Sequence, residues 1–123
     1  MAMTRDEIIR AAESYLYDGL VRQNGDAVRA ALAPDCWRIE NGKNTGKSGE
    51  EIAAAFKMPI FDIITGVHQT RWFVDGEQAF VLYTLELRDG KLPSVLIAER
   101  FRVVDGRVKE IEAIFHAQQA EPA

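Results

Sequence analysis

Glu99 is the acidic residue of this sequence whose surroundings best suit proton transfer. It lies in Val-Leu-Ile-Ala-Glu-Arg-Phe-Arg-Val, a run apolar enough to predict a buried strand over residues 93–104. Alternation along that strand puts Glu99 and Phe101 on the same face. A carboxyl group on an apolar face is expected to have a raised pKa, which suits a general acid or base near neutral pH. The alternative is an ion pair with Arg71 or Arg100 at a subunit interface.

Polar residues also end a short predicted strand at residues 36–41. Alternation puts Trp37, Ile39 and Asn41 on one face, and the two apolar members indicate that this face points inward. Asn41 would then donate or accept a hydrogen bond in a pocket, unless the Asn-Gly pair only turns the chain. By the same alternation Glu40 points away from the pocket, but a β-bulge would reverse this and make Glu40 a candidate base.

Three further side chains are candidates for a site. Tyr15 lies on the apolar stripe of a predicted N-terminal helix, where it either donates a hydrogen bond to a ligand or packs in the core. His68 lies near the start of a predicted strand, and its ordinary pKa range suits proton transfer. Arg71 shares a phase with Phe73 and would bind an anionic or phenolate group if that phase points inward. An ordinary strand histidine and a surface arginine are the alternatives.

Several large apolar side chains are predicted to line either the core or a ligand pocket, and the sequence does not separate the two roles. They are Trp37, Phe56, Tyr83, Ile111 and Phe115. Cys36 has no neighbouring basic residue in sequence, so it is expected to be a small buried hydrophobe. His116, near the end of the last predicted strand, is expected at the surface or at an interface.

Composition excludes several classes of function. The chain has 123 residues, of which 47% are hydrophobic, and a formal net charge of −4, so nucleic acid and anionic membranes are unfavourable partners. Its single cysteine excludes an internal disulfide and favours a reducing cytoplasm. Zinc-type spacing, a phosphate-binding glycine loop and a nucleophile elbow are all absent from the sequence. We therefore expect neither a metal nor another cofactor.

The elements that must position these residues follow from helix caps and turn signals. We expect three helices, each begun by a capping residue, and then a set of strands separated by Asp-Gly turns. The expected helices cover residues 4–23, 26–32 and a segment from Ser48 to before Pro59, where Ser48 and Glu51 form a capping box. The expected strands cover residues 36–41, 66–74, 78–88, 93–104 and 107–116. This order predicts a single α+β domain over residues 1–123 with an antiparallel meander.

The central strands carry apolar residues on both faces. Val81, Tyr83 and Leu85 alternate with Phe80 and Leu82, so neither phase is polar. Both faces of the sheet are therefore expected to be covered, one by the helices and the other by a second subunit. The sequence predicts a homodimer.

The order of several short motifs resembles the nuclear transport factor 2-like superfamily, which includes ketosteroid isomerase, scytalone dehydratase and the SnoaL-like cyclases. The motifs are Asn-Gly-Asp (24–26), Leu-Ala-Pro-Asp (32–35), Lys-Ser-Gly-Glu-Glu-Ile (47–52), Phe-Val-Asp-Gly (73–76) and Arg-Phe-Arg-Val-Val-Asp-Gly-Arg-Val (100–108). The resemblance implies a cone-shaped curved antiparallel sheet wrapped around the N-terminal helix, with an apolar pocket at one end. It also implies enzymes that work without cofactors.

The resemblance assigns expected roles to four of the candidate residues. Asn41 falls where the isomerases have their Asp base, Glu99 aligns with their oxyanion-hole Asp, and Tyr15 corresponds to a functional Tyr on the first helix. His68 lies near the position of a catalytic His in several members. A limonene-epoxide-hydrolase-like enzyme would need an Asp-Arg-Asp set around a water, and no Arg-x-Asp in the sequence fits that set.

Together these observations predict a small cofactorless isomerase, dehydratase or lyase. The expected ligand is hydrophobic, for example aromatic or polycyclic, with Glu99 or Glu40 moving a proton and Asn41, Tyr15 and His68 donating hydrogen bonds. The alternative is a non-catalytic ligand-binding or protein-interaction module of the same fold. An open cavity with converging polar groups would favour the enzyme, and a cone filled by aromatic side chains would favour the module.

Overall fold

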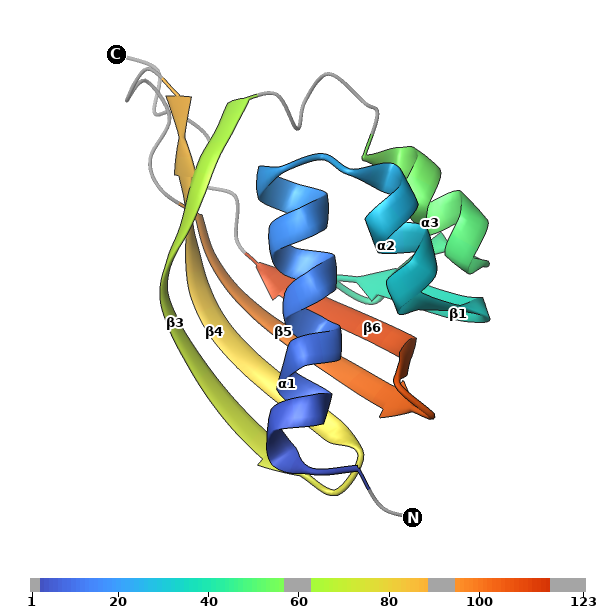
Figure 1. Cartoon of the computed structure of the whole chain (residues 1–123). Helices are drawn as coiled ribbons and strands as arrows, with labels where there is room; N and C mark the ends of the chain where they lie inside the picture. Colours follow the sequence, from blue (N-terminus) through green and yellow to red (C-terminus); the bar gives the residue numbers. More distant parts are fainter. Residues whose placement is uncertain (1–2, 57–62, 89–94, 116–123) are drawn as a thin grey trace.

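A curved six-stranded sheet wraps around the N-terminal helix (Figure 1). The computed structural model describes residues 3–56, 63–88 and 95–115. Its helical elements are α1 (Arg5–Glu13), η1 (Ser14–Val21), α2 (Gly25–Ala31) and α3 (Gly49–Ala55). Its strands are β1 (Leu32–Glu40), β2 (Lys43–Gly46), β3 (Ile64–Asp75), β4 (Gln78–Leu87), β5 (Val95–Val104) and β6 (Arg107–Phe115). The predicted α+β class and the cone-shaped sheet are confirmed.

The sheet is mixed rather than wholly antiparallel. The strand order is β2-β1-β6-β5-β4-β3, and β1 pairs with β6 in parallel while the other neighbours are antiparallel. The meander from β3 to β6 is confirmed, with turns at Asp75-Gly76 and Asp105-Gly106. The predicted Asp89-Gly90 turn, the segment around Pro59 and His116 lie outside the described residues.

The N-terminal helix begins as predicted and changes its winding halfway along. Thr4 and Glu7 form a capping box, which satisfies backbone N–H groups of the first turn. After Glu13 the chain continues as η1, a π-helix, and this wider winding still buries Tyr15 against the sheet. Gly19 is required there because a Cβ at this position would lie 2.8 Å from the Cζ atom of Phe56. The close approach lets the Phe56 ring pack edge-on against Tyr15, with ring centroids 5.4 Å apart.

The hairpin of β1 and β2 was not predicted in full. The first strand begins at Leu32 rather than Cys36, and the polar run after it contains β2. Asn41 and Gly42 both have positive φ, as a tight hairpin turn requires. The Asn-Gly pair therefore marks the turn between two strands and not the end of the strand region. β2 therefore lies at the edge of the sheet and pairs with residues 38–40 at the C-terminal end of β1.

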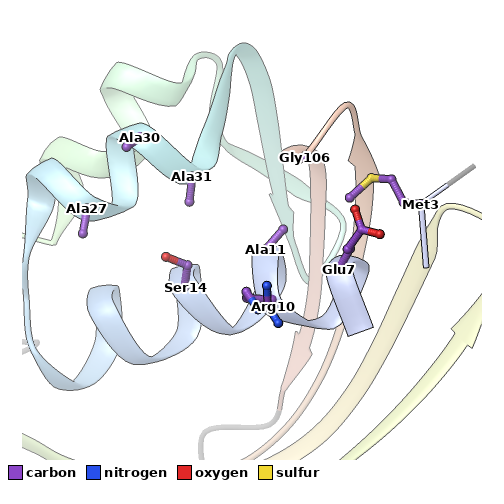
Figure 2. Close-up of a pocket in the computed structure, with 9 residues that line it drawn as sticks. All are labelled: Met3, Glu7, Arg10, Ala11, Ser14, Ala27, Ala30, Ala31 and Gly106. Atoms are coloured by element: carbon purple, nitrogen blue, oxygen red, sulfur yellow. The ribbon is translucent and has the colours of Figure 1, made fainter. Parts of the chain in front are cut away.

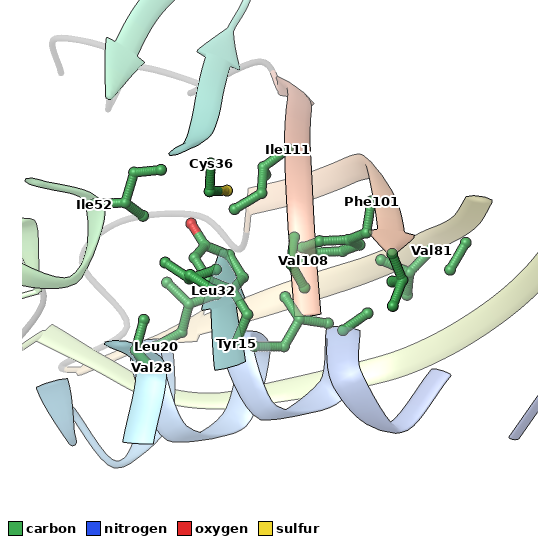
Figure 3. Packing of buried hydrophobic residues seen from close by; sticks show 14 of the residues in the cluster. Tyr15, Leu20, Val28, Leu32, Cys36, Ile52, Val81, Phe101, Val108 and Ile111 are labelled. Carbon is green, nitrogen blue, oxygen red and sulfur yellow. The ribbon is translucent and has the colours of Figure 1, made fainter. Parts of the chain in front are cut away.

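The two faces of the sheet have different surroundings. The concave face packs against α1 and η1, and its side chains form one core cluster with the helices (Figure 3). From β4 and β5 this core includes Val81, Tyr83, Ile97 and Phe101, while the alternate residues point to the convex face. The cone is therefore filled at its centre and bounded by β1, β4, β5 and the helices.

Candidate active site

β1 presents the opposite phase to the predicted one. Cys36 is fully buried, and Arg38 reaches Tyr15 on the N-terminal helix, so these residues face the concave side. Asn41 instead bonds the backbone of Phe115: its Nδ2 donates to the Phe115 carbonyl, and the Phe115 N–H donates to its Oδ1, both at 3.0 Å. The prediction that Trp37, Ile39 and Asn41 face inward is wrong. The register with β6 is regular from Trp37 to Glu40, so alternation holds there, and the apolar character of Trp37 and Ile39 indicated the wrong phase.

Arg38 connects three polar side chains at the inner end of β1. Its Nε donates to the Tyr15 hydroxyl at 3.1 Å, and its Nη1 donates to the Thr45 hydroxyl at 2.9 Å and to a carboxylate oxygen of Glu40. Thr45 lies on β2, the second strand of the β1–β2 hairpin, and Glu40 lies on the same face of β1 as Arg38. The Arg38 and Glu40 side chains are 19% and 32% exposed, so this end of the cluster reaches solvent.

Glu99 forms the buried end of the same cluster. It is 2% exposed, on the concave face of β5, and the Tyr83 hydroxyl from β4 donates to its Oε1 at 2.5 Å. Its Oε2 is buried and has no hydrogen-bond partner among the described residues. A buried oxygen without a partner is costly, and it is therefore the polar atom of the cluster that most needs an explanation. The predicted inward position of Glu99 is confirmed. Within the described chain Arg100 pairs with Glu110 and Glu112, so the alternative ion pair of Glu99 with Arg100 is not seen.

The surroundings of Glu99 raise the pKa of its carboxyl group and so favour the protonated form. Burial raises the pKa of Glu99, the charge of Arg38 and the hydrogen bond from Tyr83 lower it, and the charge of Glu40 raises it. The net direction is upward from the ordinary value. Burial also raises the pKa of both Tyr15 and Tyr83, so the two hydroxyl groups stay protonated. Burial lowers the pKa of Arg38, but Tyr15 and the two carboxylates raise it further, so the guanidinium stays charged.

Aromatic rings fill the cone below this polar cluster. The Tyr15 ring lies edge-on to Phe101, with centroids 5.5 Å apart, and Trp72 packs on Phe101 with centroids 6.4 Å apart. Phe56, Tyr83 and Ile111 are buried in the same core, and Phe115 packs against it. The polar groups thus lie at the boundary between an aromatic interior and the half-exposed end of β1.

His68 and Arg71 lie outside the cluster. His68 pairs with Glu86 of β4, with 2.9 Å between Nε2 and Oε2, and its side chain is 53% exposed. Arg71 is exposed. A register shift between these two residues changes the phase of β3, which alternation from either end does not anticipate. The structure therefore brings Glu99, Glu40 and Tyr15 together and leaves out Asn41, His68 and Arg71.

Arg38 is the site residue that the sequence analysis missed. The signal available was the neighbouring Cys36, a residue type that is usually buried, which fixes the inward phase as Cys36, Arg38 and Glu40. That phase yields Arg38-x-Glu40, two charged groups directed to the same side of one strand. Arg38-x-Glu40 is the Glu equivalent of the Arg-x-Asp pattern that a limonene-epoxide-hydrolase-like set would need.

A separate groove of 360 Å³ lies between the N-terminal helix and α2 (Figure 2). It is lined by Met3, Glu7, Arg10, Ala11, Ser14, Ala27, Ala30, Ala31 and Gly106. None of the cluster residues lines it, so it is not the candidate site. In the described part of the chain, no group of three His, Cys, Asp or Glu side chains is placed to hold a metal ion. No helix in that part is long and apolar enough to cross a membrane.

The raised pKa of Glu99 predicts a pH dependence of stability. The folded state binds the proton more tightly than the unfolded chain, where Glu has its ordinary value of 4.5. Stability is therefore greatest below that value, falls as the pH rises toward the folded pKa, and is level above it. Glu99→Gln removes this loss, so its free energy of unfolding should exceed that of the wild type by a margin that grows with pH. Urea unfolding of both proteins at several pH values measures the difference, and a constant difference would contradict the prediction.

Comparisons with known proteins agree with the fold. A structure of an LEH-like epoxide hydrolase from M. tuberculosis is 26% identical, with a TM-score of 0.75, over 94% of this chain and 86% of that one. A proposed ketosteroid isomerase from Kribbella flavida DSM 17836 is 20% identical, with a TM-score of 0.74, over 96% of this chain and 84% of the other. An NTF2-like protein from Burkholderia xenovorans LB400 is 14% identical, with a TM-score of 0.72, over 94% and 93% of the two chains.

No curated protein matches the sequence. The predicted resemblance to the nuclear transport factor 2-like superfamily is confirmed by these structural neighbours. A family model described as a domain of unknown function, DUF8021, matches residues 1–115. The chain therefore belongs to this DUF8021 family and has the nuclear transport factor 2-like fold.

Proposed function

We propose that this protein is a cofactor-independent acid–base enzyme that acts on a small, uncharged, hydrophobic molecule. The reaction that its polar cluster supports best is the addition of water to an epoxide. The observation that carries the proposal is the position of Arg38, which binds Glu40 directly and lies close enough to Glu99 for its charge to lower the pKa of that buried acid. A single guanidinium thus pairs with one carboxyl group and acts on a second through its charge.

The two carboxyl groups suit opposite roles. Glu40 is 32% exposed and paired with Arg38, so in this reaction it would accept a proton from water. Glu99 is buried with a raised pKa, so it would donate a proton from Oε2 to the ring oxygen. The water oxygen forms a bond to a ring carbon, the carbon–oxygen bond of the ring breaks, and the product is a diol. One proton enters Glu40 and one leaves Glu99, so solvent must exchange both before the next turnover.

The likeness to the epoxide hydrolase structure supports this reaction class. Enzymes of the limonene-epoxide-hydrolase kind use an Asp-Arg-Asp set around a water, and Glu40, Arg38 and Glu99 form a Glu-Arg-Glu counterpart. Thr45 and Tyr15, both bonded to Arg38, are hydroxyl groups suited to hold the water or the ring oxygen. The aromatic residues that pack around Tyr15 favour an apolar substrate over a charged one.

A second candidate is isomerisation of an enolisable ketone, with dehydration or lyase chemistry as its close relatives. The observation that favours it is that two tyrosine hydroxyl groups, Tyr15 and Tyr83, lie in one cluster with the buried acid Glu99, because a Tyr and a protonated acid form the oxyanion hole of ketosteroid isomerase. Glu40 would then remove a proton from carbon instead of from water. Both candidates use the same residues and differ in whether water becomes part of the product.

The proposal is tested by incubating the protein with a panel of apolar epoxides and β,γ-unsaturated ketones in ¹⁸O-labelled water. Diol that carries one ¹⁸O atom supports the hydrolase, and unlabelled conjugated ketone supports the isomerase. Saturable ligand binding without turnover of either class would identify the non-catalytic module, the alternative that the aromatic filling of the cone favours. Glu40→Gln and Glu99→Gln are the variants to compare with the wild type in each assay.

A further inference from the structure

Tyr83 makes the two oxygens of Glu99 unequal. The Tyr83 hydroxyl donates to Oε1 at 2.5 Å, whereas Oε2 is buried with no partner in the described part of the chain. Tyr83 and Glu99 come from adjacent strands and are both 2% exposed. A hydrogen bond between two groups without competing water is strong and directional.

We propose that Tyr83 is a positioning residue that holds Oε1 and thereby makes Oε2 the oxygen that exchanges a proton with the ligand. This inference rests on the proposed function. Tyr83 keeps its own proton, because burial raises the pKa of its hydroxyl, and it donates a hydrogen bond to Oε1. When Glu99 is protonated, this donated bond favours a proton on Oε2.

The groups around Glu99 come from three neighbouring elements. The charges of Arg38 and Glu40, both on β1, change the pKa of Glu99, as does the hydrogen bond from Tyr83 on β4. Tyr15 on η1 interacts with the charge of Glu99 in turn. Among them Tyr83 donates the hydrogen bond to the carboxylate, which favours the ionised form. Its removal should therefore move the titration of Glu99 to higher pH while leaving the charges of Arg38 and Glu40 in place.

The test is Tyr83→Phe, with Tyr17→Phe as the matched control on the π-helix. The protonated carboxyl of Glu99 is followed by its infrared carbonyl band, assigned by subtracting the spectrum of Glu99→Gln. The midpoint should rise by about one to two pH units in Tyr83→Phe, as expected for loss of a hydrogen bond to a charged group. Tyr17→Phe should leave it unchanged.

An unchanged midpoint in Tyr83→Phe would overturn the positioning role. The titration needs no substrate, so it does not depend on the enzymatic proposal. Conversely, wild-type activity in Glu99→Gln would remove the proposed function while the spectroscopic result for Tyr83 would still stand. If Tyr83→Phe fails to fold, the band is instead followed in wild-type protein that carries fluorinated tyrosine. The more acidic hydroxyl of fluorinated tyrosine should lower the midpoint of the Glu99 titration.

Discussion

Glu99→Gln is expected to lower turnover by about 10²- to 10⁴-fold, the range that a positioned general acid contributes. The amide keeps the shape of the carboxyl and still accepts the hydrogen bond from Tyr83, but it has no acidic proton to give from the position of Oε2. Because the buried acid is inclined to be neutral, the substitution removes little favourable charge interaction. The loss should therefore appear in kcat, with thermal stability equal to or above that of the wild type.

Glu112→Gln is the matched control for this variant. Glu112 lies on the neighbouring strand β6 and pairs with Arg100 on the convex side of the sheet, outside the cluster. It undergoes the same chemical change without touching the proposed site, so its turnover should equal that of the wild type. Equal activity in Glu99→Gln and Glu112→Gln would show that the buried acid does not transfer a proton.

Arg38→Met has the second large expected effect, because it removes the centre of the cluster. Methionine retains much of the apolar stem but leaves Glu40, Tyr15 and Thr45 without their shared donor. Turnover should fall by about 10²-fold or more, in the range for loss of one preorganised electrostatic donor. Stability should fall by about 1–3 kcal/mol, since partly buried acceptors lose a charged hydrogen-bond partner. Kinetics and urea unfolding measure the two effects separately.

Arg38→Lys distinguishes charge from geometry at this position. Lysine retains the positive charge near Glu99 but cannot bond Tyr15 and Glu40 through separate nitrogen atoms of one planar group. If the fork geometry matters, activity stays low while the pKa of Glu99 remains close to that of the wild type. Full activity in Arg38→Lys would mean that a point charge suffices, and full activity in Arg38→Met would exclude Arg38 from the site.

Much of the fold follows from local signals in the sequence. The Thr4 capping box, the Ser48 N-cap and the Asp-Gly turns lie where the structure has helix starts and hairpins. Glu99 was also predictable, because an acid within a long apolar strand has few places to point except the core. Tyr15 followed from the apolar stripe of the first helix, although the π-helical winding that holds it leaves no clear sequence signal.

The errors have two physical causes. In β1 the register with β6 is regular from Trp37 to Glu40, but the apolar side chains of Trp37 and Ile39 indicated the wrong phase, so Asn41 was assigned to the pocket in place of Arg38. In β3 a register shift between His68 and Arg71 breaks the alternation, and His68, a candidate through the family resemblance, pairs with Glu86 outside the site. Bulges depend on pairing with distant strands, so local sequence does not encode them.

The most direct test of the account is the hydrolysis of one apolar epoxide in ¹⁸O-labelled water by the wild type, Glu40→Gln and Glu99→Gln. We predict a diol with a single ¹⁸O atom from the wild type and severe loss of turnover in both variants, because one carboxyl activates the water and the other protonates the ring oxygen. Absence of diol from the wild type, or undiminished diol formation by both variants, would contradict the assignment of Glu40 as the base and Glu99 as the acid.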